Sequence, residues 1–281
     1  MRALLRWSTP SRLSTRTGAK PLARILSELS DRGVLRLTID RAERRNALDR
    51  ETLEELEAAL GDGGTDRRVK VIVLRGAGEQ AFSAGADLGE LREHETIEAY
   101  RRHFDLVARV ILAMHRAGAP VVSRVQGFAL AGGCGLAVAA DFTIAAESAV
   151  FGLPEIGIGL LPMVVSAPIY RATGSRKVVL DLMLTGRRVA AREALALGLA
   201  TRVVPDPALD SEVDSLAATL CGYSPTALRL GKEAVHTMCE MEYATSLRYL
   251  REMIVLTSLT DDAKEGLRAY FEKRAPVWKG Q

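Results

Sequence analysis

Two glycine-rich segments contain the residues of this sequence that are best suited to chemistry. The first is residues 83–88 (SAGADL), and the second is residues 127–136 (GFALAGGCGL). Small side chains allow backbone N–H groups to face a ligand, and a helix beginning near Gly133 would direct the positive end of its dipole at an oxyanion. Tight turns or close helix packing would explain the same glycines. The pattern therefore indicates either an oxyanion site or two structural turns.

A single carboxylate stands in the apolar run 151–159 (FGLPEIGIG). Glu155 is its only ionisable side chain, and apolar surroundings raise the pKa of a carboxylate toward the range that suits proton transfer near neutral pH. The alternative is a surface glutamate that caps a turn. We expect Glu155 to be a general acid–base group.

Other catalytic signatures are missing from the sequence. It has no G-x-x-x-x-G-K-[ST] phosphate loop, no H-E-x-x-H and no G-x-S-x-G. The four histidines have neither ligand nor triad spacing, and we expect His94 and His103 on solvated helix faces. The three cysteines also lack metal-site spacing, which indicates a reducing compartment and no metal. Nucleotide hydrolysis, zinc hydrolysis and serine esterase chemistry are therefore disfavoured.

The charge is unevenly distributed along the 281 residues, whose formal net charge is +3. Residues 1–27 hold six basic residues and no acidic one, so the remainder carries more acidic than basic groups. Nucleic acid, RNA included, is therefore not expected as the main ligand. No uncharged run reaches the roughly 20 residues that a bilayer requires, so no membrane partner is expected. The basic extension is typical of a bacterial protein in the cytoplasm or, alternatively, of a transit peptide for the mitochondrial matrix.

Strands alternate with helices up to about residue 205, which indicates an α/β class. Strands are expected at residues 34–39, 69–74, 121–125, 142–146 and 201–204. Beyond them the pattern becomes helical, at residues 209–220, 225–238, 243–256 and 261–274. The predicted organisation is an extension (1–27), a core (28–205) and a helical oligomerisation region (206–281).

Taken in order, several segments resemble the crotonase superfamily and, within it, the enoyl-CoA hydratase/isomerase family. The matching segments are residues 45–48 (RNAL), 83–88, 127–136, 140–141 (AD), 151–159, 184–188 (LTGRR) and 271–274 (FEKR). The resemblance implies a crotonase-like spiral of ββα units, a helical C-terminal trimerisation region, and homotrimers or hexamers. It also implies an acyl-CoA substrate and no separate cofactor, because CoA is part of the substrate.

The resemblance assigns roles to individual residues. The backbone N–H groups of Ala86 and Gly132 correspond to an oxyanion hole for the thioester carbonyl, and Glu155 to the catalytic glutamate. Arg44, Arg45 and Lys273 are expected to meet the CoA phosphates. The full set assigned to the substrate and CoA is Arg44, Arg45, Ala47, Ala84, Asp87, Leu88, Gly133, Pro154 and Lys273.

Two departures from the family pattern bear on the reaction. Hydratases of the family use a second glutamate, and its position here is Gly135. Moving a double bond needs one base, so the sequence favours enoyl-CoA isomerisation. Hydration remains an alternative if Asp87, Glu90 or Glu93 supplies the second carboxylate. A non-catalytic acyl-CoA-binding protein remains a further alternative.

The second departure is residues 162–168 (PMVVSAP), which stand where many hydratases have a glycine-rich turn. Bulky residues there are expected to narrow or redirect the acyl pocket.

Overall fold

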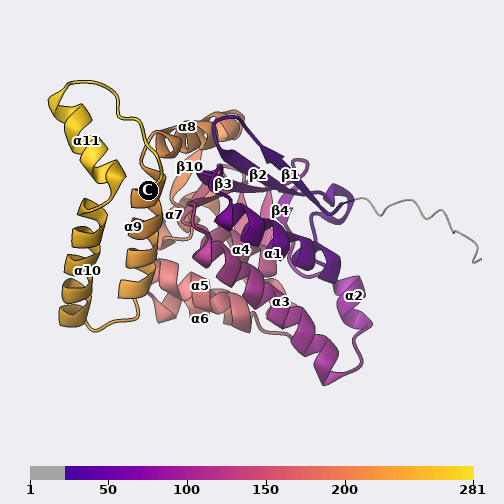
Figure 1. Ribbon diagram of the computed structural model, residues 1–281. Helices are drawn as coiled ribbons and strands as arrows, with labels where there is room; N and C mark the ends of the chain where they lie inside the picture. The colour runs from indigo at the N-terminus through magenta and orange to yellow at the C-terminus, as the bar shows by residue number, and fades with distance from the viewer. Residues whose placement is uncertain (1–22) are drawn as a thin grey trace, which may run out of the picture.

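Two β-sheets lie at the centre of the molecule, and the computed structural model that contains them describes residues 23–281 (Figure 1). The larger sheet has the strand order β1 (Ile25–Leu29), β2 (Val34–Ile39), β3 (Val71–Gly76), β5 (Val121–Val125), β7 (Phe142–Ala146) and β10 (Arg202–Val204). The smaller sheet has the order β4 (Ala81–Ser83), β6 (Phe128–Leu130), β8 (Val150–Gly152) and β9 (Arg188–Ala190). Within these sheets the pairs β1–β2 and β8–β9 are antiparallel and the others are parallel.

From β3 to β8, successive strands alternate between the two sheets. In the pairs β3–β4, β5–β6 and β7–β8, the first strand belongs to the larger sheet and the second to the smaller one. Each pair leads into helices: α2 (Leu88–Arg92) and α3 (Ile97–Arg116); α4 (Gly132–Ala139); and η2 (Pro154–Ile158), α5 (Met163–Thr173) and α6 (Arg176–Thr185). This repetition confirms the predicted α/β spiral of ββα units.

Helices cover both faces of the larger sheet. β3 is buried along almost its whole length, as its continuous apolar sequence predicts for a central parallel strand. One face packs against α1 (Arg50–Thr65), which Asp49 caps by accepting a hydrogen bond from the Thr52 N–H at 2.9 Å. The other face packs against α8 (Leu209–Cys221).

Two predicted boundaries shift in the structure. Strand β1 begins at Ile25, inside the range 1–27 that charge alone assigns to the extension, because five residues pair with β2 despite the nearby basic side chains. Residues 1–22 lie outside the described part. Helix α8, predicted to begin the oligomerisation region, packs instead on the larger sheet through Leu209, Val213 and Leu216.

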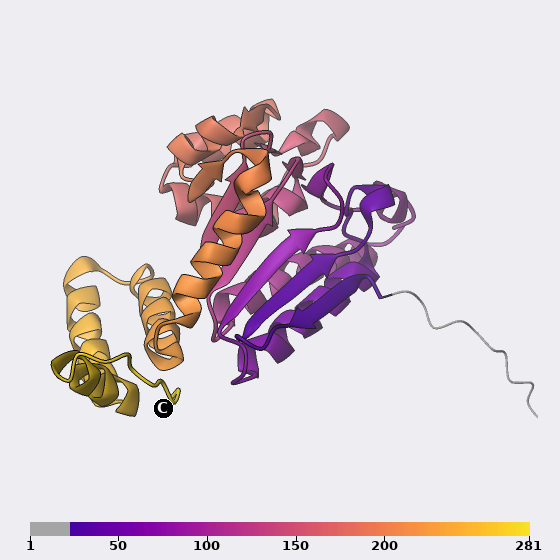
Figure 2. The ribbon, with the colours of Figure 1, turned by 90° about the horizontal axis from the view of Figure 1, so that it is seen from above.

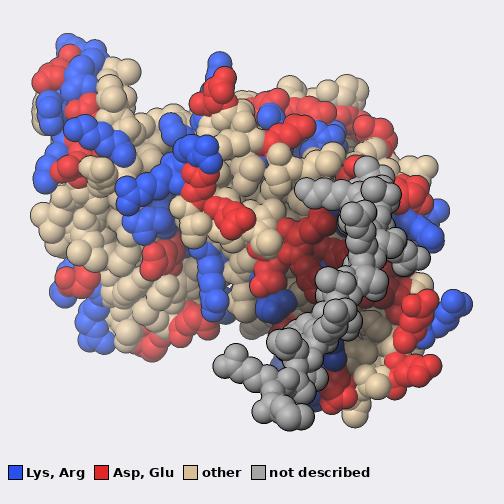
Figure 3. Space-filling view, turned by 45° about the vertical axis from the view of Figure 1, so that its right-hand side comes forward, with Lys and Arg blue, Asp and Glu red and all other residues tan. Residues whose placement is uncertain are grey.

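The last three helices form an arm that extends from the core (Figure 2). They are α9 (Pro225–Met238), α10 (Tyr243–Ser258) and α11 (Asp261–Phe271); the connection before α8 contains α7 (Ala191–Leu197) and η3 (Asp206–Ala208). Large apolar side chains on the arm are exposed, among them Leu247, Ile254 and Phe271. Lys and Arg alternate with Asp and Glu over the arm, whereas acidic side chains gather near the hollowed middle of the face shown (Figure 3). Within residues 23–281, no helix combines the length and apolar character needed to cross a membrane.

The expectation that His94 and His103 lie on solvated helix faces is wrong for both. His94 lies outside the helices, after α2, and its side chain is 14% exposed. His103 is 2% exposed and lies on the face of α3 that packs into the core. Neither of its ring nitrogens has a hydrogen-bond partner within the described residues, and burial lowers its pKa. The apolar stripe of α3 continues through this position, since Leu106, Val107 and Val110 are buried on the same helix.

Candidate active site

The two predicted oxyanion donors lie next to each other. A Cβ built on Gly132 would lie 3.9 Å from the backbone nitrogen of Ala86 and 3.7 Å from the Cα of Gly85. Ala86 follows β4 and Gly132 follows β6, and these two strands are parallel neighbours. Parallel strands end at the same edge of a sheet, which explains why two segments distant in sequence meet here.

Leu48 holds the first donor in place. Its N–H donates to the Gly85 carbonyl at 2.8 Å, and its own carbonyl accepts from the Asp87 N–H at 3.1 Å. The residues on both sides of Ala86 are therefore hydrogen-bonded to Leu48. In an extended strand successive N–H groups point in opposite directions, so the N–H of Ala86 faces away from Leu48 and toward the site.

The second donor begins helix α4. Its N-cap, Ala131, has φ 53° and ψ −128°, a conformation that non-glycine residues rarely adopt. Gly85 packs against it with φ 90°, and a Cβ on Gly85 would lie 2.5 Å from the Cβ of Ala131. The first N–H groups of a helix have no partner within the helix, and the dipole favours negative charge at this end. The arrangement can bind an oxyanion through backbone donors.

The predicted acid–base group lies in η2, which follows β8. Burial raises the pKa of Glu155 to about 7, and its Oε2 is a buried atom without a hydrogen-bond partner in the described residues. The N–H of Ala131 donates to Gly152 at 2.9 Å, which ties the start of α4 to the strand leading into Glu155. Burial, and after it the charge of Glu155, raises the pKa of the Cys134 thiol to about 12. Glu155 thus lies close enough to the first turn of α4 to affect its electrostatics.

The position of the missing second glutamate is filled by a neighbouring side chain. A Cβ on Gly135 would lie 2.2 Å from Cγ1 and 2.4 Å from the Cβ of Val165, which is a buried residue of α5. Contacts this short do not occur between carbon atoms, so a larger residue at 135 would require α5 or Val165 to move. Val165 occupies the space that any side chain of residue 135 would enter.

Of the three acidic residues expected to substitute for the second glutamate, Asp87 and Glu90 are engaged in other contacts, whereas Glu93 is exposed and its carboxylate has no partner among the described residues. Asp87 accepts hydrogen bonds from the Gly89 N–H at 3.0 Å and from Nη2 of Arg41 at 3.0 Å. Burial opposes its ionisation, but these bonds outweigh burial and hold the pKa of Asp87 below its ordinary value. Glu90 accepts a hydrogen bond from the backbone N–H of Arg50 at 2.9 Å. Asp87 therefore lacks the raised pKa that favours proton transfer at neutral pH in Glu155.

The remaining predicted binding residues divide into those near the donors and one far from them. Ala84 lies beside the 44–47 segment, because its N–H donates to the Arg45 carbonyl at 3.0 Å. Arg44, Arg45 and Leu88 are exposed on this side, Gly133 packs on Ser83, and Pro154 immediately precedes Glu155. Lys273 follows α11, which lies at the other end of the molecule from α2 in Figure 1. One chain therefore does not bring Lys273 to the two arginines.

Supporting residues behind the site were not predicted. Arg41 and Asn46 are buried, and Asn46 donates through Nδ2 to the carbonyls of Ala77 and Ala81 at 2.9 and 2.7 Å. Ser83 donates from Oγ to the Asn46 carbonyl at 2.8 Å. The adjacent arginines look alike in the sequence, and only the fold distinguishes the buried Arg41 from the exposed Arg44 and Arg45.

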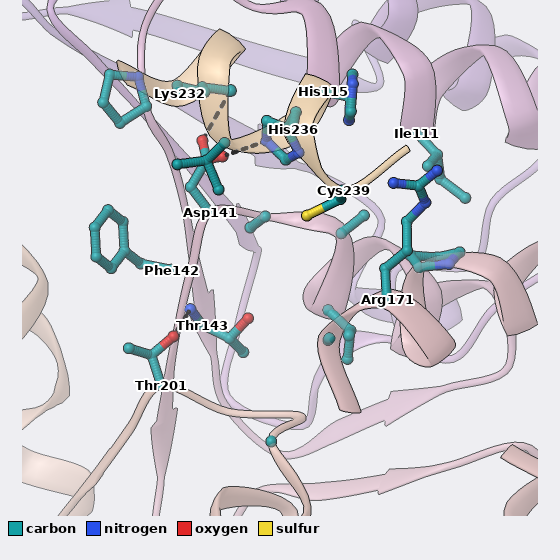
Figure 4. A pocket seen from close by; sticks show the side chains of 18 of the residues that line it. Ile111, His115, Asp141, Phe142, Thr143, Arg171, Thr201, Lys232, His236 and Cys239 are labelled. Carbon is teal, nitrogen blue, oxygen red and sulfur yellow. Dashed lines mark hydrogen bonds and ion pairs between the residues drawn. The ribbon is translucent and has the colours of Figure 1, made fainter. Parts of the chain in front are cut away.

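A large cavity lies away from these residues, between the C-terminal ends of α3, α4 and α5 and helix α9. Its volume is about 930 Å³. Figure 4 shows Lys232 and His236 of α9 reaching Asp141, at 2.8 and 3.1 Å. Nζ of Lys232 also donates to the Met114 carbonyl at 2.8 Å, so this cluster anchors the arm to the core. The cavity lies at the opposite end of α4 from Gly132.

Comparisons with known proteins identify the family of the chain. Residues 30–281 match the sequence model of the family described as "Enoyl-CoA hydratase/isomerase". The chain is 39% identical to a "Probable enoyl-CoA hydratase" of Rhizobium meliloti, over 86% of this chain and 93% of that protein. It is 33% identical to a "Short-chain-enoyl-CoA hydratase" of Clostridium acetobutylicum, over 85% and 91% of the two chains. The crystal structure of an enoyl-CoA hydratase from Bacillus anthracis superimposes with a TM-score of 0.87 at 33% identity, covering 92% of this chain and all of that one.

Proposed function

Since the chain belongs to the enoyl-CoA hydratase/isomerase family, we propose that this acyl-CoA enzyme moves the double bond of an enoyl-CoA with a single base, Glu155. The observation that supports this is the contact between Gly135 and Val165, because it leaves no room for a second carboxylate where a hydratase would place one.

The proposed reaction begins at a 3-enoyl-CoA. The thioester oxygen accepts hydrogen bonds from the N–H groups of Ala86 and Gly132, and the carboxylate of Glu155 removes a proton from carbon 2. The electron pair of that C–H bond moves into a dienolate whose oxygen carries the negative charge. Losing one such oxyanion donor typically costs about 10²- to 10³-fold in rate. Glu155 then returns the proton to carbon 4, which gives the 2-enoyl-CoA.

The raised pKa of Glu155, about 7, suits both halves of this transfer. A base with a pKa near the working pH is ionised in part of the population and still binds the proton long enough to return it. Asp87 and Glu90, whose oxygens accept hydrogen bonds from the protein, serve better as structural groups than as a source of activated water.

Hydration of a 2-enoyl-CoA is the second candidate, because the relatives are named hydratases. The test offers the purified protein a 3-enoyl-CoA and a 2-enoyl-CoA separately, and follows the products by mass and by the ultraviolet absorbance of a double bond conjugated with the thioester. Isomerisation leaves the mass unchanged, whereas hydration adds one water. We expect isomerisation of the first substrate, lost in Glu155→Gln. Rapid hydration of the second, also lost in Glu155→Gln, would contradict the single-base reaction. Binding without turnover of either would support a non-catalytic acyl-CoA-binding protein.

We also propose that the arm mediates a homotrimer or hexamer. The support is the exposed apolar residues of α10 and α11, including Leu247, Ile254 and Phe271, which a single chain leaves uncovered. A second copy would be needed to bring a Lys273 to Arg44 and Arg45. Light scattering of the purified chain tests the assembly, and a monomer at micromolar concentration would contradict it. A bacterial cytoplasmic or mitochondrial location remains a prediction from the sequence.

A further inference from the structure

A buried arginine lies behind the oxyanion donors. The side chain of Arg41 is 7% exposed, although it precedes the surface helix η1 (Ala42–Arg44). Its Nη1 donates to the Ala47 carbonyl at 2.6 Å. Its Nη2 lies 3.0 Å from Oδ2 of Asp87 and 3.1 Å from Oδ2 of Asp49. One guanidinium therefore joins the segment of residues 47–49 to the loop that contains Asp87.

Each partner of Arg41 is adjacent to a group that fixes Ala86. Ala47 precedes Leu48, which hydrogen-bonds to Gly85 and Asp87 on the two sides of Ala86. Asp87 follows Ala86 directly and caps α2 by accepting from the Gly89 N–H. A change in the position of either partner would rotate the peptide that carries the Ala86 N–H.

The charges around Arg41 show what its removal would do. Asp49 and Asp87 have side chains that are 15% and 18% exposed, and both contact the same nitrogen of the guanidinium. Without Arg41, Asp49 would keep Arg24 at 3.8 Å, whereas Asp87 would keep no cation among the described residues, and the two poorly solvated carboxylates would repel each other. Asp49 is fixed as the N-cap of α1, whereas Asp87 lies on a loop followed by a five-residue helix. The loop that contains Ala86 is therefore the part expected to move.

We propose that Arg41 is a positioning residue for the reaction: it holds the loop of residues 85–87 so that the Ala86 N–H points at the thioester oxygen. This inference rests on the proposed function, since it requires that an acyl-CoA carbonyl binds between Ala86 and Gly132. Preorganised donors act only when they are held within about 0.5 Å of the productive geometry. Loss of Arg41 should lower kcat by about 10- to 100-fold, which does not exceed the typical cost of losing one oxyanion donor. KM should change much less.

The test compares Arg41→Met with Arg124→Met. Arg124 is an equally buried arginine, with 5% side-chain exposure, that pairs with Asp210 at 2.7 Å on the α8 side of the sheet. Both variants lose an ion pair of a buried guanidinium, although Asp210 is 64% exposed, and only the first lies behind the donors. The measurements are kcat and KM, thermal unfolding, and the infrared stretch of a ¹³C-labelled thioester carbonyl in a bound saturated acyl-CoA.

We expect the wild type and Arg124→Met to lower the carbonyl frequency equally, because both keep two oriented donors. Arg41→Met should show a smaller shift together with the lower kcat, and Arg41→Lys should recover part of both. If Arg41→Met does not fold, Asp87→Asn serves as a second variant, because it weakens the contact between Arg41 and the loop while Arg41 keeps Asp49. A reduced shift of the carbonyl frequency is again expected.

Two failures can be distinguished. An unshifted carbonyl in the wild type, with the acyl-CoA bound, would refute the oxyanion site and with it the proposed function. A shift in the wild type that is unchanged in Arg41→Met, with only the unfolding temperature lowered, would overturn the positioning role alone.

Discussion

The contact between Gly135 and Val165 predicts a strong energetic coupling between two helices. A methyl group added at 135 would lie 2.2 Å from Cγ1 and 2.4 Å from the Cβ of Val165. Overpacking of this kind typically costs about 1–3 kcal/mol, whereas glycine to alanine within a helix usually stabilises by about 1 kcal/mol. We expect Gly135→Ala to lower the free energy of unfolding by about 1–2 kcal/mol.

The matching change removes the obstructing side chain. Val165 is 4% exposed, so Val165→Gly loses a buried isopropyl group and places a glycine in α5. We expect a cost of about 3 kcal/mol from lost burial and helix propensity together. In Gly135→Ala/Val165→Gly the nearest remaining atom is the Cα of residue 165, at 3.3 Å, so the new methyl fits with a small adjustment. The double variant should be more stable than the sum of the single changes predicts, by at least about 1 kcal/mol.

Urea unfolding of the wild type, both single variants and the double variant measures this coupling. Gly61→Ala in α1 is the matched control, because a Cβ there would meet nothing within 4 Å. Changes that add to within about 0.5 kcal/mol would refute the reasoning, since independent sites behave in this way. So would a Gly135→Ala variant stabilised as much as Gly61→Ala.

The same pair tests why the enzyme is proposed to use one base. Gly135→Glu alone should destabilise the protein without adding activity, because its side chain cannot enter the space held by Val165. Gly135→Glu/Val165→Gly provides that space and a second carboxylate, and we expect measurable hydration of a 2-enoyl-CoA that the wild type lacks. Mass analysis of the product distinguishes the two variants.

Three further predictions concern other residues. The proposed reaction uses Glu155 as its base, and burial raises the pKa of Glu155 to about 7, so kcat/KM should rise through pH 7. The raised pKa also costs stability as pH rises above the unfolded value of 4.5, so Glu155→Gln should unfold at a higher temperature than the wild type at pH 8 but not at pH 4. Asp141→Asn should cost about 3 kcal/mol in urea unfolding at pH 7, because it leaves Lys232, 7% exposed, without its carboxylate, and Asp141→Asn/Lys232→Met should recover part of the loss. Burial opposes ionisation of Asp141, but His236 and Lys232 outweigh it and lower its pKa, so its contribution should be complete above about pH 4 and disappear as pH falls through the lowered pKa. Ala131→Gly should raise the unfolding temperature by relieving the positive φ of 53°, and no change would indicate that the N-cap is unstrained.

Local sequence patterns predicted five of the six strands of the larger sheet, all except β1, and none of the smaller one. The expected strand at residues 34–39 and the expected helix at residues 225–238 match β2 and α9 to the residue. Strands β4, β6, β8 and β9 have three residues each, too few to show an alternation, and they exist because distant segments pair. No local pattern reports such pairing.

Some residues of the candidate site were predictable from the sequence, and others were not. Glycines 85 and 132 and the isolated Glu155 indicated chemistry from their types, and the family resemblance ordered them; the structure then places Gly132 beside Ala86. The burial of Arg41 was not predictable, because Arg44 and Arg45 are the same residue type in the same short segment and are exposed. His103 was misjudged for the same reason, since burial depends on how α3 packs.

The proposed use of main-chain donors at Ala86 and Gly132 would make the site unusually tolerant of mutation. Every amino acid except proline carries a backbone N–H, so most substitutions cannot remove these hydrogen-bond donors. They can only block access to the donors or change their orientation. The acid–base groups have no such protection, because a single codon change removes a carboxylate. Position 135 lies in the first turn of α4, near the donor of Gly132. A carboxylate there, with space made at Val165, could therefore change the reaction that follows the thioester enolate while both oxyanion donors stay the same.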